Sequence, residues 1–165
     1  MRILGVCGSL RKASSNLRLL ETLGERLSEG IEMVIFDGIG RIPPLNPDLL
    51  SRPPLPASVI EWKRALADSN AVLIASPEYG YSIPGALKNA IDWVYGSGEL
   101  FHKPVAITAA VQREEQGLNG LAALHQTLMA AKGDVFWADT ILHDEQIDQQ
   151  IDSALYAIER RLQYR

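Results

Sequence analysis

The feature that most constrains the fold of this chain is a repeated alternation between short apolar runs and longer segments with helical spacing. The short runs have the length and composition of buried strands, and the longer segments place apolar residues three and four positions apart. We expect strands at residues 2–7, 31–36, 71–76, 104–110 and 134–138. Such an alternation predicts βα units and a parallel sheet.

Four helices are indicated by apolar faces, three between the expected strands and one near the C-terminus, over about residues 144–161. Their faces carry Leu17, Leu20, Leu23 and Leu27; Leu87, Ala90, Ile91 and Val94; Leu121, Leu124 and Leu128; and Ile147, Ile151, Leu155, Ile158 and Leu162. Six of the nine prolines fall between Pro43 and Pro56. We therefore expect a rigid surface loop there rather than a helix.

Two of the expected strands, at 72–75 and 105–107, are apolar on both faces, which is typical of parallel strands covered by helices on both sides. Five such strands with right-handed crossovers suit an α/β doubly wound sheet in the order 2-1-3-4-5. Ligands bind these sheets at the carboxyl ends of strands 1 and 3, where the winding reverses. We expect the functional site in the loops after these two strands.

Length and composition predict one domain, spanning residues 1–165, with 47% hydrophobic and 22% charged residues. A net charge of −4 provides no basic field for nucleic acid or a membrane surface. Cys7 is the only cysteine and has no internal disulfide partner. No apolar run approaches the roughly 20 residues of a membrane span. We therefore expect a cytoplasmic protein with small-molecule partners.

The loop after the first expected strand, residues 8–16, is rich in groups that bind anions. A helix N-terminus follows it and supplies free backbone N–H groups. The loop has neither GxGxxG nor Gly-Lys-Ser/Thr, so it favours one terminal phosphate over a pyrophosphate or a magnesium triphosphate. A simpler alternative is that one polar residue only caps the helix. The candidate phosphate ligands are Ser9, Arg11, Ser14, Ser15 and Asn16.

The loop after the third expected strand, residues 76–85, is shaped by Pro77 and Pro84. Its backbone can bind the polar edge of a heterocycle, and Tyr79 or Tyr81 can stack on such a ring. The alternative is a turn whose tyrosines only pack on neighbouring residues. The position of the loop beside the point where the winding reverses favours the ring site.

The two loops together resemble the NAD(P)H-dependent FMN reductase family, which also includes quinone, azo and chromate reductases. The motifs are Gly-Ser-Leu-Arg-x-x-Ser-x-Asn from Gly8 and Pro-Glu-Tyr-x-x-Ser-x-Pro-Gly-x-Leu-Lys-Asn-Ala-Ile-Asp-Trp from Pro77. The resemblance implies a flavodoxin-like, FMN-binding domain and a homodimer or homotetramer. By this resemblance, Ser9, Arg11, Ser14 or Ser15, and Asn16 hold the FMN phosphate, and Pro77, Glu78, Tyr79 and Gly80 contact the flavin ring.

Two features depart from the family pattern. Gly80 stands where the family commonly has Asn. The loop from Ala109 to Gly120 is long, whereas the family usually has a short loop rich in Gly and Ser. Only Gly117 and Gly120 can stand for the family's glycines. These departures concern the edge of the flavin ring.

The function expected from the resemblance is ping-pong hydride transfer from NADPH or NADH to bound FMN, and on to a quinone, flavin, azo or metal-oxyanion acceptor. We assign no catalytic side chain and no metal site, because FMN itself carries the chemistry. The alternative is a flavodoxin-like one-electron carrier that does not oxidise NAD(P)H. Such carriers are usually strongly acidic with an uncharged phosphate loop, so Arg11 favours the reductase. A non-redox phosphate binder is a third possibility if the long loop excludes flavin.

Overall fold

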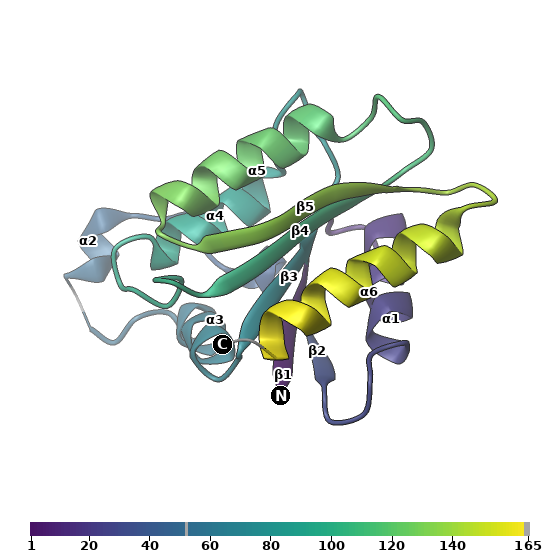
Figure 1. The fold of residues 1–165 in the computed structure, drawn as a ribbon. Coiled ribbons are helices and arrows are strands. Elements are labelled where there is room, and N and C mark those ends of the chain that lie inside the picture. The colour runs from purple at the N-terminus through teal and green to yellow at the C-terminus, as the bar shows by residue number, and fades with distance from the viewer. Residues whose placement is uncertain (52, 164–165) are drawn as a thin grey trace.

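The computed structural model describes residues 1–51 and 53–163 and contains an all-parallel sheet of five strands (Figure 1). The strands lie in the order β2-β1-β3-β4-β5, which confirms the predicted topology. Each neighbouring pair is parallel. The strands are β1 (Arg2–Cys7), β2 (Glu32–Phe36), β3 (Ala71–Ala75), β4 (Pro104–Val111) and β5 (Asp134–Leu142).

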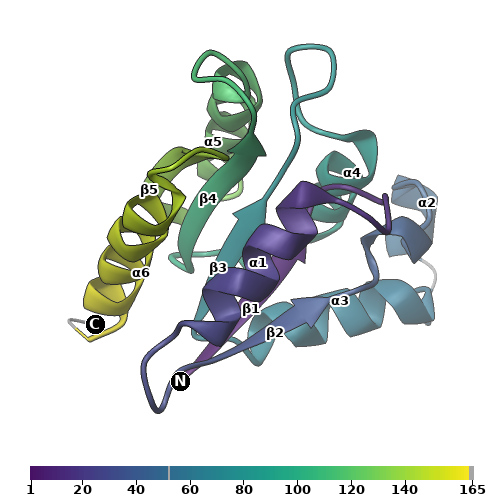
Figure 2. The same ribbon diagram turned by 90° about the vertical axis from the view of Figure 1, so that its right-hand side faces the viewer.

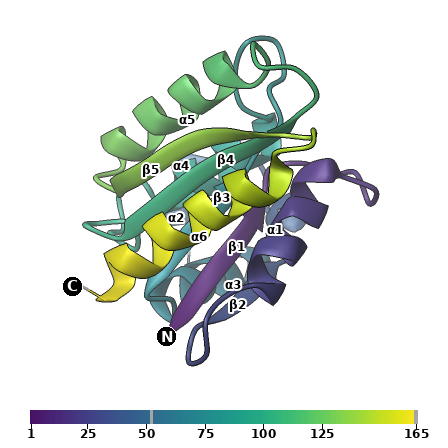
Figure 3. The same cartoon turned by 45° about the vertical axis from the view of Figure 1, so that its right-hand side comes forward.

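Helices cover both faces of the sheet, as the strand pattern predicted (Figures 2 and 3). One face carries α1 (Ser15–Glu25) and α6 (Ile147–Gln163), whose apolar residues pack together with those of the strands. The other carries α3 (Ala57–Ala67), α4 (Gly85–Val94) and α5 (Leu118–Ala130). Along β3, Val72 and Ile74 face the second layer and Leu73 and Ala75 the first. Burial on both faces explains why β3 is apolar throughout.

The proline-rich segment differs from the expected loop. A 3₁₀ turn η1 (Ile39–Arg41) precedes it, and it contains a one-turn helix α2 (Pro47–Leu50). Proline suits the first turn of a helix, which needs no backbone donor there, and the Asn46 side chain caps α2 by accepting a hydrogen bond from the Asp48 N–H at 3.0 Å. Helix α3, absent from our sequence prediction, begins directly after Pro56 and buries Val59, Trp62 and Leu66.

The proline-rich segment is held to the second helix layer by two residues of α4. The Asn89 amide donates to the Pro43 carbonyl at 3.0 Å, and the Trp93 indole N–H donates to the same oxygen at 2.7 Å. The Asn89 side-chain oxygen in turn accepts from the Leu45 N–H at 2.8 Å. Asn89 and Trp93 belong to the second motif, and in the structure they fix the segment after β2.

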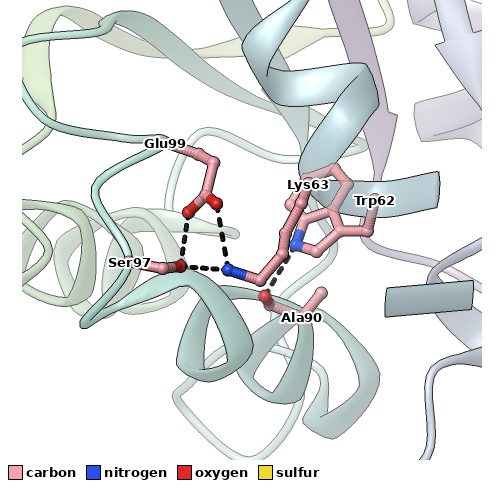
Figure 4. A network of polar contacts seen from close by, with 5 residues as sticks. All are labelled: Trp62, Lys63, Ala90, Ser97 and Glu99. Atoms are coloured by element: carbon pink, nitrogen blue, oxygen red, sulfur yellow. Dashed lines mark hydrogen bonds and ion pairs between the residues drawn. The ribbon is translucent and has the colours of Figure 1, made fainter. Parts of the chain in front are cut away.

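A polar network joins α3 to the segment between α4 and β4 (Figure 4). The Lys63 ammonium pairs with the Glu99 carboxylate at 2.9 Å and also contacts Ser97, which donates to Glu99. Burial alone would raise the pKa of Glu99, but hydrogen bonds from Ser97 and Lys63 outweigh it and lower the pKa below its usual value. Beside it, the Trp62 indole N–H donates to the Ala90 carbonyl at 2.8 Å. The network therefore ties three chain segments into one layer.

Strand β5 is longer than the run predicted at 134–138. It pairs with β4 as far as Val111 with Leu142, past the charged Asp139. Because β5 lies at the edge of the sheet, Ala138 and Asp139 are exposed there. Exposure of an edge strand removes the apolar pattern on which the sequence prediction relied.

Candidate functional site

The loops after β1, β3 and β4 gather at one end of the sheet, at the top of Figure 2. Gly8 seats the first loop against the second. Its N–H donates to the Ala75 carbonyl at 2.8 Å, and a Cβ on Gly8 would lie 2.6 Å from the Ser76 hydroxyl oxygen. A larger residue at Gly8 would crowd the side chains of Ser76 and Leu87, so glycine permits the close approach of the two loops. The strand order thus brings the two predicted site loops into contact.

The start of α1 has the properties of an anion site. Ser14 is its N-cap, but the Ser14 side chain makes no capping hydrogen bond, and the first turn contains no acidic residue. The N–H groups of this turn and the positive end of the helix dipole are therefore not neutralised by the helix itself. The alternative in which a loop residue only caps the helix does not describe Ser14 in this structure.

Asn16 connects the first loop to β4. Its side chain is 3% exposed, and its carbonyl oxygen accepts a hydrogen bond from the Ala110 N–H at 2.9 Å. A phosphate needs donors, so the amide nitrogen is the part of Asn16 that suits the predicted role. Asn16 also fixes the start of α1 relative to the end of β4.

The second loop is a tight turn that presents two tyrosines. Tyr79 and Ser82 exchange backbone hydrogen bonds of 2.9 and 3.0 Å, and Gly80 and Tyr81 between them have φ of 57° and 60°. Two left-handed central residues define a type I′ turn. Tyr79 is 54% exposed and Tyr81 79% exposed. The tyrosines are therefore not packed away, as the alternative interpretation of this loop required.

Glu78 has a contact that the sequence did not suggest. Its carboxylate accepts a hydrogen bond from the Gly120 N–H at 2.8 Å, in the first turn of α5. The N-cap of α5 is Gly117, which has no side chain to cap the helix, so Glu78 supplies the missing acceptor from another loop. A Cβ on Gly120 would lie 3.0 Å from the Glu78 Cβ, so this glycine permits the close approach.

A cavity of about 410 Å³ lies between the second loop, the start of α1 and the third loop. Of the candidate ligand contacts that the sequence analysis singled out, Ser15, Pro77, Glu78 and Tyr81 lie in its wall. The sequence analysis did not single out the polar residues of the third loop that also line it. These are Gln112, Glu115, Gln116 and Asn119, and the Gln116 side-chain oxygen accepts a hydrogen bond from the Gln112 N–H at 3.1 Å. The long third loop therefore forms one wall of this cavity.

Two other predicted ligands line a separate cavity of about 470 Å³. Ser9 and Arg11 lie in its wall, together with Lys12, Cys7 and the segment from residue 35 to 41. Of the remaining candidates, Ser14 and Asn16 are buried at the start of α1, whereas Tyr79 and Gly80 are exposed on the turn. The structure thus places the candidate residues on both sides of the first loop rather than around one cavity.

Within residues 1–51 and 53–163, no three His, Cys, Asp or Glu side chains are grouped so that they could hold a metal ion. In the same part of the chain, no helix has both the length and the apolar character needed to cross a membrane. Cys7 is a buried free thiol, with its sulfur 3.7 Å from the Ser14 hydroxyl oxygen.

Comparison with known proteins agrees with this arrangement of loops on a doubly wound sheet. The sequence profile of the NADPH-dependent FMN reductase family matches residues 1–142, so the chain belongs to this family. A NAD(P)H:quinone oxidoreductase of Solanum tuberosum is 42% identical over 96 residues, 56% of this chain and 49% of that protein. A quinone reductase of Escherichia coli (strain K12) is 35% identical over 109 residues, 65% of this chain and 58% of that protein.

Among solved structures, the flavoenzyme NAD(P)H:(acceptor) oxidoreductase FerB from Paracoccus denitrificans superposes with a TM-score of 0.72 at 26% identity. The superposition covers 96% of this chain and 97% of FerB. The matches to the potato and E. coli proteins span between about half and three fifths of those proteins. FerB therefore resembles this chain over its whole fold, whereas the potato and E. coli proteins are longer and match it over only part of their length.

Proposed function

We propose that this chain is a cytoplasmic FMN-containing oxidoreductase that takes hydride from NADPH or NADH and reduces a quinone, flavin, azo compound or metal oxyanion. Membership of the NADPH-dependent FMN reductase family supports the cofactor and the donor. The observation that carries the proposal is the cavity beside the uncapped start of α1, between the second and third loops. In this proposal the start of α1 binds an anionic group and the second loop contacts a flat ring, while Ser9 and Arg11 approach the anion from the separate cavity on the other side of the first loop.

The residues present fit FMN. The start of α1 offers backbone donors without a competing carboxylate, and Ser14 has a hydroxyl that is not used for capping. Ser9, Arg11, Ser15 and the amide nitrogen of Asn16 add donors around the same loop, as a phosphate monoester requires. The second loop, from Pro77 to Gly80, would contact the ring. When bound, FMN supplies the capacity to accept a hydride and return two electrons.

In this proposal the residues of the chain bind FMN, orient its ring and shield the ring from solvent. Glu78 is held by Gly120 and so connects the second loop to the start of α5. Asn16 joins the start of α1 to β4. Hydride transfer requires no protein acid or base, so positioning accounts for the role of these residues. One open face would serve the donor and the acceptor in turn, which is the physical basis of the ping-pong scheme.

The test is a titration of the purified protein with FMN, followed by anaerobic addition of NADPH and then of menadione. The bound flavin should lose its visible absorption with NADPH and regain it with the quinone. Steady-state rates should give parallel lines in double-reciprocal plots. Binding of FMN without oxidation of either NADPH or NADH would support the one-electron carrier instead, and failure to bind FMN would reject both.

Assembly is a separate part of the proposal. The resemblance to the family supports a homodimer or homotetramer. Sedimentation equilibrium of the protein with and without FMN measures the mass directly. A monomer at all concentrations would reject this part of the proposal and leave the cofactor assignment unaffected.

A further inference from the structure

A third cavity, of about 330 Å³, lies between helices α1 and α6, which cover the same face of the sheet (Figure 3). Its deepest residues, Leu19, Ile141 and Ile151, belong to the apolar core of that face and are 6%, 3% and 3% exposed. We call it the α1–α6 cavity. A mostly apolar cavity of this volume, with a few polar groups in its wall, has the character of a small-molecule site.

The ionisable residues in the wall leave one cation available. They are Arg18, His143 and Asp148. The Asp148 carboxylate is paired with the Arg26 guanidinium at 2.7 Å, so its charge is already matched. Within residues 1–51 and 53–163, by contrast, the Arg18 side chain has no ion pair. A guanidinium without a partner suits a carboxylate, which it can bind with two parallel hydrogen bonds.

The geometry of α1 places this cation beside the apolar interior of the cavity. Ser15, Leu19 and Thr22 follow one another at spacings of four and three residues and so share one face of the helix, with Arg18 at its edge. Leu19 is buried, whereas Arg18 is exposed. The cavity therefore combines an apolar interior with a positive charge at its rim. A ligand that matches both has an apolar body and one anionic group.

We propose that the α1–α6 cavity is a second ligand site, which binds a small apolar carboxylate with the carboxylate at Arg18 and the apolar body against Leu19, Ile141 and Ile151. The site is distinct from the 410 Å³ cavity, although Ser15, Ala110, Val111 and Gln112 line both. These four residues form a common wall. The inference goes beyond the proposed function and does not depend on it, because it concerns the opposite side of that wall.

The first test is calorimetric titration of the full chain with 2-naphthoate, with and without saturating FMN. The neutral control is 2-naphthalenemethanol, which has the same rings without the charge. Arg18→Ala should weaken binding of 2-naphthoate about 3- to 10-fold, as expected for a partly exposed charge-assisted contact. It should leave the affinity for the alcohol within about twofold. The matched control is Arg64→Ala, which removes another exposed arginine from a helix, α3, and should change neither affinity.

The second test fills the apolar interior and leaves the charge in place. Thr22 is half-buried in the wall, and Thr22→Met extends a longer apolar side chain into the cavity. Both naphthalene compounds should then bind about 10-fold more weakly or worse, because the added side chain occupies their space. Thermal unfolding of Thr22→Met checks that the variant is folded. In the wild type, amide chemical shifts should move most at Thr22 and Ile151 when 2-naphthoate is added, and less at Tyr81.

Three results would overturn the inference. The first is that the wild type binds 2-naphthoate no more tightly than the alcohol, or that Arg18→Ala and Arg64→Ala have equal effects, since Arg18 would then be an ordinary solvated arginine. The second is a loss of 2-naphthoate binding with Arg11→Ala in place of Arg18→Ala, which would put the carboxylate in the first loop. The third is unchanged binding to Thr22→Met, or shifts centred on Tyr81, which would place the ligand in another cavity. If the chain binds no FMN, the proposed function fails, and the titrations without FMN still decide this site.

Discussion

The helix layer of α3 and α4 and the loops at the carboxyl end of the sheet use aromatic residues in opposite ways. Trp62 and Trp93, in the helix layer, are 1% and 2% exposed, and each donates its indole N–H to a backbone carbonyl. Tyr79 and Tyr81, in the second loop, are more than half exposed on a turn with left-handed residues. The first region uses aromatic rings to fix the fold, and the second presents them to solvent.

This contrast separates stability from binding in one small chain. The helix layer is satisfied internally, with polar groups such as Lys63 and Glu99 paired in a network that is mostly shielded from solvent. The loops keep donors at the start of α1 and two tyrosine rings without such partners. Changes in the first region should alter unfolding and changes in the second should alter ligand affinity.

The largest effect is expected for Trp62→Ala. This substitution removes a buried ring that lies 5.1 Å from the Phe36 ring and deletes the hydrogen bond to Ala90. Unfolding by urea should show a loss of about 3–5 kcal/mol, as for other buried aromatic truncations. A loss below about 1 kcal/mol would contradict the assignment of Trp62 to the fixed layer, because exposed residues give changes of that size.

Arg11→Ala tests the other region. The lost charge-assisted hydrogen bond to phosphate should weaken FMN binding by about 1.5–3 kcal/mol, roughly 10- to 150-fold, with no change in unfolding of the apoprotein. Riboflavin, which lacks the phosphate, should bind the variant and the wild type equally well.

Lys12→Ala is the matched control for Arg11, because it removes a neighbouring charge of the same loop. Its effect on FMN affinity should be several-fold smaller, since lysine lacks the forked guanidinium. Equal losses for the two substitutions, or equal losses for FMN and riboflavin, would remove Arg11 from the phosphate site.

Glu99→Gln addresses the polar network of the helix layer. We expect a loss of about 1 kcal/mol at neutral pH, because the cost of desolvating Glu99 and Lys63 offsets much of their mutual attraction. The folded-state pKa of Glu99 is lowered, so its stabilising contribution is present above the unfolded pKa and disappears as the pH falls through the folded pKa. Urea unfolding of the variant and the wild type should therefore converge as the pH falls below about 4.

Glu61→Gln is the control for this pH dependence. The Glu61 carboxylate lies 4.0 Å from Arg41, and both side chains are about 60% exposed. Its substitution should leave stability within about 0.5 kcal/mol across the same pH range. A stability difference between wild type and Glu99→Gln that does not change with pH would show that the charge of Glu99 is not what stabilises the layer.

The smallest effect is expected for Gly80→Asn, which restores the residue that the family commonly has. Gly80 has a φ of 57°, and no atom lies within 4 Å of a Cβ built on it. Asparagine tolerates this left-handed conformation better than most residues, so urea unfolding should change by less than about 0.5 kcal/mol. Gly80→Val should cost about 1–2 kcal/mol. Equal costs for the two variants would mean that space, not conformation, selects glycine.

The sheet was predictable from the sequence because its central strands are buried on both faces. Runs such as Ala71 to Ala75 carry no polar residue and left no ambiguity. Helix α3 was missed although Val59, Trp62 and Leu66 have helical spacing, because the preceding prolines suggested an irregular segment. Proline in fact suits the start of a helix, and α3 begins immediately after Pro56.

The site was predictable as a set of loops but not as a set of contacts. The motifs around Arg11 and Tyr79 mark the first and second loops, and the strand order places both at one end of the sheet. The bonds of Glu78 to Gly120 and of Asn16 to Ala110 join residues far apart in sequence. Such pairs depend on how loops meet in three dimensions, which no local pattern encodes. The left-handed backbone conformation of Tyr81 is likewise visible only in the structure.

The hydrogen bond between the Asn16 side chain and the Ala110 N–H also bears on when the site forms during synthesis. The two residues are 94 positions apart in the sequence. Asn16 follows β1 and Ala110 lies in β4, and β3 separates these two strands in the sheet. Contacts of such separation form late, because the intervening chain must first be ordered. A nascent chain that has not yet delivered Ala110 from the ribosome has the proposed phosphate loop but lacks the hydrogen bond that fixes it to β4. Flavin capture at the proposed site is therefore expected only from a chain that has been synthesised past Ala110.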